Sequence, residues 1–181
     1  MTELVVLLDD KLKSIGIHDK QTVHGSDTPL HLGFSLFLFN QQNQLLLQQR
    51  AKSKITWPGV WSNSVCGHPM PGEAVTQAAV RRLKYELGIV QPLDEIQLVL
   101  SDYRYKYSFG GITENEHCPV MVTRYVGPVY PNAQEVAATR WVDWEEFLTT
   151  IRRANKYSEW CVEEAELLST DTAFKDFLSH S

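Results

Sequence analysis

The stretch GHPMPGEAVTQAAVRRLKYELGI, residues 67–89, carries the clearest periodic signal in the chain. Four of its apolar residues recur at helical spacing and form one stripe: Val75, Ala79, Leu83 and Leu87. The stripe predicts a helix from Glu73 to Leu87. Gly88 follows it directly, in the position where a glycine commonly ends a helix. The rest of the predicted fold is arranged around this helix.

Two charged residues of the predicted helix, Arg82 and Glu86, lie on its apolar side. An i,i+4 pair at an exposed helix edge would explain them and would contribute only about 0.3 kcal/mol. Glu86 falls within the stripe, however, and a buried carboxylate needs a partner or a metal ion. An arginine beside it suits an anionic ligand. The helix is therefore a candidate part of a binding site.

The segments around the helix alternate between strand-like and helix-like patterns. Strands are predicted at 3–9, 30–40, 44–50, 62–66, 96–106, 116–126 and 136–142, the second and third joined by the turn NQQN as a hairpin. Two helices are predicted at 144–153 and 158–178. This order predicts an α/β (α+β) fold, namely an α/β/α sandwich with a mixed β-sheet and C-terminal helices. Because no linker-like or repeated segment interrupts it, we expect one domain over residues 1–181.

The composition and charge of the chain exclude some classes of function and indicate its compartment. The chain has 181 residues and a net charge of −5, which argues against a nucleic-acid partner. Its apolar runs fall short of the roughly 20 residues that span a bilayer, and the apolar N-terminal stretch lacks the basic start of a secretory signal. The cysteines, Cys66, Cys118 and Cys161, are few and odd in number, which favours a reducing compartment. We therefore expect a cytoplasmic protein.

Two pairs of chemically active residues share an i,i+2 spacing. Cys66 and His68 are separated by one residue, as are Glu114 and Glu116, so each pair lies on one face of an extended strand. A buried cysteine is usually a small core residue, and a solvated strand edge would explain two glutamates. The apolar CPVMV run after Glu116 places that pair at the edge of the core instead.

Two further histidines, His24 and His31, lie in VHGSDTPLHLGF, where Pro29 prevents a helix between them. Three imidazoles, with His68, and two carboxylates would make a mixed nitrogen and oxygen site. Such a site suits Mg²⁺, Mn²⁺ or Zn²⁺. His18, His117 and His180 are treated as incidental.

Residues 67–89 resemble the Nudix box, G-x5-E-x7-R-E-U-x-E-E-x-G-U, where U is a bulky apolar residue. Seven positions match: Gly67, Glu73, Arg81, Leu83, Glu86, Gly88 and Ile89. Arg82 and Tyr85 stand where the pattern has glutamates that hold Mg²⁺ in Nudix hydrolases. The departure weakens hydrolysis as a prediction, and an arginine in place of a glutamate favours phosphate binding.

Taken together, five runs resemble the type I isopentenyl diphosphate isomerase family, in that family's order: HGSDTPLHLGFS, WPGVWSNSVCGHP, RRLKYELG, DYRYKY and GITENEHCPV. The resemblance extends from about Lys20 to Trp160 and is closest to the short, bacterial type. It implies the conversion of isopentenyl diphosphate to dimethylallyl diphosphate, in which a double bond moves through a tertiary carbocation.

The resemblance also implies residue roles. Cys66 and Glu116 would be the acid and base on opposite faces of the substrate, with Tyr105 assisting Glu116. The metal would be bound by five residues: His24, His31, His68, Glu114 and Glu116. A second Mg²⁺ would bridge the diphosphate to Glu86. Four cations would contact the diphosphate: Lys20, Arg50, Lys54 and Arg82. Trp160 would face the allyl unit, although a core aromatic on the C-terminal helix would explain it nearly as well.

Two other functions compete with the isomerase. A Nudix-type diphosphate hydrolase would need the helix carboxylates that Arg82 and Tyr85 replace. A non-catalytic Nudix module that binds a ligand or partner gives no reason to combine Cys66, His68 and the glutamate pair. We therefore expect a small-molecule isoprenoid diphosphate as substrate, no nucleic-acid or membrane partner, and a monomer or weak dimer.

Overall fold

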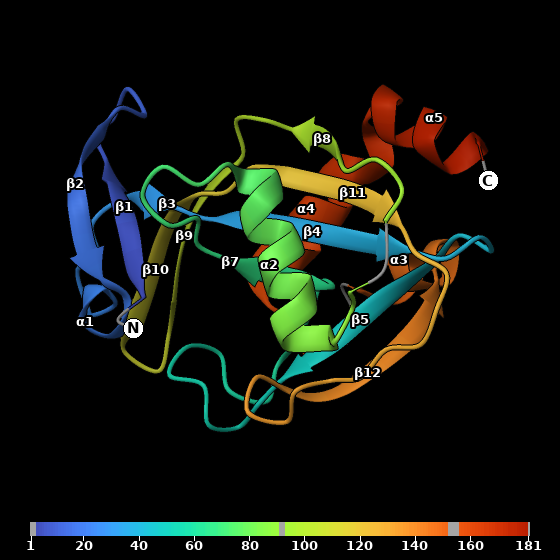
Figure 1. Ribbon diagram of the computed structural model, residues 1–181, viewed down its shortest axis with the longest axis horizontal. Coiled ribbons are helices and arrows are strands. Elements are labelled where there is room, and N and C mark those ends of the chain that lie inside the picture. Colours follow the sequence, from blue (N-terminus) through green and yellow to red (C-terminus); the bar gives the residue numbers. More distant parts are fainter. Residues whose placement is uncertain (1–2, 91–92, 152–155, 181) are drawn as a thin grey trace.

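The computed structural model describes residues 3–90, 93–151 and 156–180 (Figure 1). The strands are β1 (Leu4–Leu8), β2 (Ser14–Asp19), β3 (His31–Leu32), β4 (Phe34–Phe39), β5 (Gln44–Arg50), β6 (Trp61–Ser62), β7 (Val65–Gly67), β8 (Gln97–Leu100), β9 (Arg104–Phe109), β10 (Ile112–His117), β11 (Val120–Arg124) and β12 (Val136–Asp143). The helices are α1 (Lys20–Val23), α2 (Val75–Leu87), α3 (Trp144–Thr150), α4 (Glu159–Thr170) and α5 (Thr172–Ser179). No helix of the described ranges is both long and apolar enough to cross a membrane.

The strands form two sheets. The five-stranded sheet has the order β2-β1-β3-β10-β9, and the seven-stranded sheet has the order β12-β5-β4-β11-β8, with β6 and β7 added at β5 and β4. Parallel pairs, β3 with β10 and β4 with β11, lie among antiparallel neighbours. The predicted mixed pairing is confirmed, but it is divided between two sheets.

The division falls at Gly33 and at Cys118–Pro119, where two predicted continuous strands are interrupted. The chain crosses from β3 to β4 through Gly33, and from β10 to β11 through the Cys118–Pro119 pair. The Gly33 backbone N–H still donates to the His117 carbonyl at 2.9 Å, so the two chains stay side by side through the gap. The prediction of unbroken strands at 30–40 and 116–126 was therefore wrong at these points.

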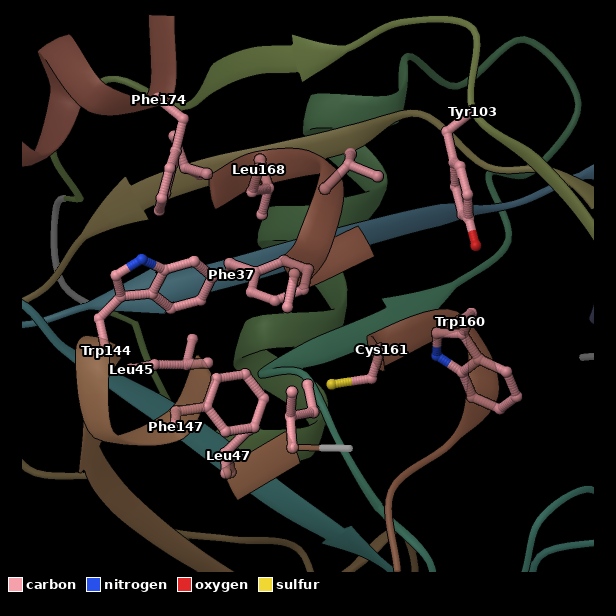
Figure 2. Packing of buried hydrophobic residues seen from close by; sticks show 14 of the residues in the cluster. Phe37, Leu45, Leu47, Tyr103, Trp144, Phe147, Trp160, Cys161, Leu168 and Phe174 are labelled. Atoms are coloured by element: carbon pink, nitrogen blue, oxygen red, sulfur yellow. The ribbon is translucent and has the colours of Figure 1, made fainter. Parts of the chain in front are cut away.

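Residues alternate along β4 and β5 between two apolar layers. Leu36, Leu38 and Leu46 pack with Leu83 and Leu87 of α2. On the opposite face, Figure 2 shows the layer made by these strands and the C-terminal helices: Phe37, Leu45, Leu47, Trp144, Phe147, Cys161, Leu168 and Phe174. Since helices cover both faces of the seven-stranded sheet, the predicted sandwich is confirmed (Figure 1).

Helix α2 begins at Val75, two residues later than predicted, and ends at Gly88, whose φ of 66° is the left-handed conformation that glycine adopts most easily. Arg82 and Glu86 are both buried on its apolar side, as the periodicity indicated. The second C-terminal helix is in fact two, because the Asp171 side chain accepts a hydrogen bond from the Phe174 backbone N–H and starts α5. Residues 152–153 of the predicted first helix lie outside the described ranges.

Candidate active site

A cavity of about 370 Å³ opens where the two sheets meet. Eleven of the thirteen predicted site residues line it: Lys20, His24, Arg50, Lys54, Cys66, His68, Arg82, Tyr105, Glu114, Glu116 and Trp160. The other two lie behind its wall, because His31 is fully buried and Glu86 is held by Arg82. A hollow of about 720 Å³ beside Trp57 contains none of the predicted residues. The smaller cavity is therefore the candidate site.

At one side of the cavity, three imidazoles and a carboxylate converge. The ligand atoms of His24, His31, His68 and Glu116 all lie within 4.8 Å of one another. Nε2 of His68 is 3.0 Å from Glu116 Oε1 and 3.2 Å from Nε2 of His31. Nε2 of His24, which is buried, has no hydrogen-bond partner among the described residues. Such a donor set suits a divalent metal ion, which would also satisfy that nitrogen.

The strand register brings these ligands together. His31 lies directly opposite Glu116 in the parallel β3–β10 pair. The His31 Nδ1–H donates to the Pro29 carbonyl at 2.9 Å, which turns Nε2 toward the cluster. Glu116 reaches the imidazoles through the space over Gly33, where a Cβ would lie 1.8 Å from Glu116 Oε2. The absence of a side chain at Gly33 is thus a condition of the cluster.

Electrostatics favour the metal-binding form of His24, His68 and Glu116. Burial lowers the pKa of His24 to about 4 and that of His68 to about 3, so both rings are neutral at pH 7. Burial lowers the pKa of His31, but the hydrogen bond to Glu116, the charge of that carboxylate and the hydrogen bond to the Pro29 carbonyl together make the net shift upward. Burial opposes ionisation of Glu116, yet His68 and His31 hold its pKa well below the usual range. Neutral rings beside a carboxylate are the ligand forms that a metal ion needs.

Glu114 is not part of this four-residue group. Its Oε2 accepts a hydrogen bond from the Tyr105 hydroxyl at 3.0 Å. Burial and the neighbouring Glu116 raise the pKa of Glu114, and Arg50 acts in the opposite direction. Tyr105 therefore holds Glu114 in place, while the predicted role of Glu114 as a metal ligand stays a prediction.

The Cys66 side of the cavity is built from uncharged groups. The Cys66 thiol donates to Asn63 Oδ1 at 3.0 Å, and its sulfur lies 3.5 Å from Ser35 Oγ. Burial raises the pKa of the thiol to about 12. Cys66 therefore holds its proton at neutral pH.

Trp160 and Tyr105 form an aromatic wall of the cavity, with rings stacked 5.5 Å apart. Trp160 is buried and also packs against Trp57 at 5.0 Å. Trp160 therefore belongs to the core and also lines the cavity, while its predicted contact with the allyl unit stays a prediction.

Three of the four predicted diphosphate-binding cations are already paired with carboxylates. Arg82 contacts Glu86 at 2.7 Å, Glu135 at 3.0 Å and Glu3 at 3.4 Å. Lys20 contacts Glu3 at 2.5 Å, and Lys54 contacts Glu135. Glu86 is thus held by Arg82 and stands apart from the histidine cluster.

Arg50 differs from the other three cations, because its guanidinium binds a neutral residue. Its Nε and Nη2 donate to the Thr56 carbonyl at 3.1 and 2.8 Å, and Nη2 also donates to Thr56 Oγ1 at 2.7 Å. These bonds fix the position of the Arg50 charge beside Glu114 and Trp160.

Sequence reasoning missed several residues of the site. Glu3, Glu135 and Asn63 carry no local pattern that marks them. Glu164 does carry one, since it falls three residues after Cys161 and four before Leu168 on the buried face of α4. A glutamate at that spacing is the same signal that marked Glu86.

Comparison with known proteins places the fold. A Nudix domain model matches residues 29–161. A crystal structure of a Deinococcus radiodurans protein has a TM-score of 0.72 at 19% identity and covers 91% of this chain and 98% of its own. The MutT protein of Methanosarcina mazei has a TM-score of 0.60 at 17% identity and covers 78% and 96%. The fold and the box on α2 define a Nudix-superfamily protein.

Relatives of higher identity define the family within that class. The isopentenyl-diphosphate delta-isomerase of Saccharopolyspora erythraea is 48% identical over 169 residues, which cover 92% of this chain and 86% of the relative. The enzyme of the same name from Klebsiella pneumoniae is 44% identical over 179 residues, covering 98% and 96%. The chain belongs to the isopentenyl-diphosphate delta-isomerase family.

Proposed function

We propose that this protein interconverts isopentenyl diphosphate and dimethylallyl diphosphate, with Cys66 and Glu116 as the groups that give and take the proton. The observation that carries the proposal is the presence of both side chains on the lining of one cavity of about 370 Å³. One is a buried thiol and the other a carboxylate, and each is hydrogen-bonded in place. The relatives named above support the substrate.

The reaction needs one proton gained and one lost. A proton added to the terminal alkene carbon leaves a positive charge on the branched carbon. Loss of a proton from the carbon next to the diphosphate-bearing one then forms the internal double bond, so atoms and charge balance. One of Cys66 and Glu116 gives and the other takes, and in the reverse reaction the roles exchange.

On the Glu116 side, Tyr105 and Glu114 form a hydrogen-bonded pair at 3.0 Å beside the carboxylate. The Tyr105 hydroxyl donates a hydrogen bond to Glu114, which would fix the phenol ring beside the substrate and Glu116. Four residues would hold the divalent ion, His24, His31, His68 and Glu116, with Glu114 as a fifth ligand. When bound, that ion would polarise Glu116 and make its proton more acidic.

Water would capture the carbocation unless the site excludes water. Trp160 and Tyr105 provide stacked ring faces on the cavity wall. A cation over a desolvated indole face gains about 2 kcal/mol. Trp160 therefore both stabilises the charge and keeps water from it.

The diphosphate would bind at the opposite end of the cavity, where Lys20, Lys54 and Arg82 line the wall. Their present partners, Glu3 and Glu135, are carboxylates that a diphosphate can replace. Arg50 would add a fixed charge nearer the reacting carbons. A second Mg²⁺, bridging the diphosphate to Glu86, would complete this end.

Hydrolysis is disfavoured by α2 itself. Two of the three positions that supply metal-binding glutamates in the Nudix box carry Arg82 and Tyr85 instead. The third is Glu86, and its carboxylate forms an ion pair with Arg82. An arginine in place of a glutamate adds positive charge, which favours binding a diphosphate over binding a metal ion that activates water. Three free cysteines are in keeping with a cytoplasmic protein, and we expect a monomer or weak dimer.

The proposal is tested by incubating the protein with isopentenyl diphosphate and Mg²⁺ in D₂O and following the product by NMR. We expect dimethylallyl diphosphate that carries deuterium. Released phosphate would instead indicate a hydrolase, and unchanged substrate would contradict both activities.

A further inference from the structure

The core behind Cys66 contains a carboxyl group that the proposed reaction does not use. Glu164, in the middle of α4, is fully buried. Its Oε1 accepts a weak hydrogen bond from the Cys118 thiol at 3.8 Å, and its Oε2 has no hydrogen-bond partner among the described residues. No Lys, Arg or His of the described chain forms an ion pair with it. A leucine or methionine would fill this place without leaving polar atoms unsatisfied.

The surroundings of Glu164 favour its uncharged form. Burial raises its pKa well above the ordinary range, and the Glu116 charge acts in the same direction. Interactions with Ser35 and Cys118 oppose the shift without reversing it. A neutral carboxyl group has an O–H to donate, and the Ser35 hydroxyl, which interacts with the Glu164 side chain, has an oxygen that can accept it.

Ser35 connects Glu164 to the cavity. Its hydroxyl oxygen lies 3.5 Å from the Cys118 sulfur and 3.5 Å from the Cys66 sulfur. Ser35 stands directly opposite Cys66 in the β4–β7 pair, so the backbone holds this contact in place. A serine hydroxyl has one proton to donate. If the Ser35 oxygen accepts a hydrogen bond from Glu164, the Ser35 hydroxyl proton is free to point at the Cys66 sulfur.

We propose that Glu164 is a positioning residue that acts on Cys66 through Ser35. Its carboxyl group donates to the Ser35 oxygen, and the Ser35 hydroxyl in turn donates to the Cys66 sulfur. The Cys66 S–H then points toward Asn63, and the sulfur still accepts one hydrogen bond, from Ser35, when its proton leaves. The inference rests on the proposed function, because it concerns the reaction at Cys66.

Four variants test this chain of hydrogen bonds with isopentenyl diphosphate as substrate. Glu164→Met keeps the length of the side chain but cannot donate, and we expect kcat to fall at least tenfold with KM within twofold. Glu164→Gln keeps a neutral donor, and we expect it to restore most of that loss. Ser35→Ala should lower kcat as much as Glu164→Met does. The double variant Ser35→Ala/Glu164→Met should be no slower than Ser35→Ala alone, because both changes break the same chain of hydrogen bonds to Cys66.

A matched control separates positioning from packing. Leu168→Met changes a buried residue one turn further along α4 without altering a polar group, and we expect wild-type kcat. Thermal unfolding of all variants shows whether each is folded. Since Met is apolar, Glu164→Met should unfold at or above the wild-type temperature while losing activity, which a purely structural role would not produce.

Three results would overturn the inference: full activity of Glu164→Met, effects of Ser35→Ala and Glu164→Met that multiply, or a loss confined to KM. Failure of Glu164→Gln to restore activity would also overturn it, because the amide preserves the donor. A wild-type protein inactive on isopentenyl diphosphate would overturn the proposed function first. An active wild type with an equally active Glu164→Met overturns this inference alone.

Discussion

The two sides of the cavity bury the same kind of group in opposite states. Glu116 lies among imidazoles and has a pKa held well below the usual range, whereas Glu164 lies among a serine and a thiol and has a pKa raised well above it. Both carboxyl groups are buried. The difference comes from the neighbours, because His68 and His31 outweigh the effect of burial on Glu116, whereas Ser35 and Cys118 do not outweigh it on Glu164. One side is therefore prepared for a metal ion, and the other is kept neutral around a thiol.

The largest effect should follow from removing either reacting group. We expect Cys66→Ala and Glu116→Gln each to lower kcat by roughly 10³-fold, in the range for loss of a general acid or base. Circular dichroism should show a folded protein in both cases. Wild-type-like turnover in either variant would remove that residue from the proton-transfer role and leave the reaction to one side of the cavity.

A smaller effect should follow from displacing Glu116 without altering its chemistry. A Cβ at position 33 would lie 1.8 Å from Glu116 Oε2, so Gly33→Ala should push the carboxylate out of the cluster. We expect roughly a hundredfold loss of kcat, the order that a misplacement of about 1 Å produces. The melting temperature should also stop rising with added Mn²⁺ or Zn²⁺.

Gly25→Ala is the control for that change, because nothing lies within 4 Å of a Cβ there. It should keep both activity and the response to metal ions. If Gly33→Ala also kept the metal response, Glu116 would not be a ligand.

The smallest effect concerns stability against pH, and it should have opposite signs on the two sides. The folded pKa of Glu164 lies above its ordinary value of 4.5, so its contribution is present below pH 4.5 and is lost as pH rises. The folded pKa of Glu116 lies below 4.5, so its contribution is present above pH 4.5 and is lost as pH falls. Each single-proton difference changes the unfolding free energy by at most about 1.4 kcal/mol per pH unit.

Urea unfolding of the chelator-treated protein measures both slopes. Relative to wild type, Glu164→Gln should gain stability as pH rises from 5 to 8, and Glu116→Gln should gain it as pH falls from 4.5. Glu163, Glu116 and Cys118 also act on Glu164, and His68 and His31 on Glu116, so the difference from each variant isolates one group. Equal slopes for wild type and Glu164→Gln would mean that Glu164 is ionised in the fold.

Much of the site could be predicted because its residues lie in short runs with a fixed period. The i,i+4 spacing on α2 placed Arg82 and Glu86 on the buried face, and the structure buries both. The i,i+2 spacing of Cys66 and His68 brought both to the cavity. The convergence of the histidines with Glu116 came from the family resemblance, because nothing local in the sequence relates His24 to residue 116.

What could not be predicted depends on contacts between distant segments. The break at Gly33 looks like any glycine in a strand until Glu116, 83 residues later, is seen to fill its space. Glu3 and Glu135 meet Arg82 from 79 residues before it and 53 residues after it in the chain. Glu164 is the exception, because its spacing from Cys161 and Leu168 already places it on the buried face of the helix. It was not singled out from the sequence as a buried carboxylate.

The pairing of the cations has a consequence for how a ligand arrives. Lys20, Lys54 and Arg82 are matched by Glu3, Glu86 and Glu135, so the mouth of the cavity carries almost no net charge of its own. Such a mouth projects a weak field, and long-range attraction adds little to the rate of encounter with an anion. The rate of association should therefore depend only weakly on ionic strength. The diphosphate binds after contact, when it replaces the carboxylates as the partner of the Lys and Arg side chains.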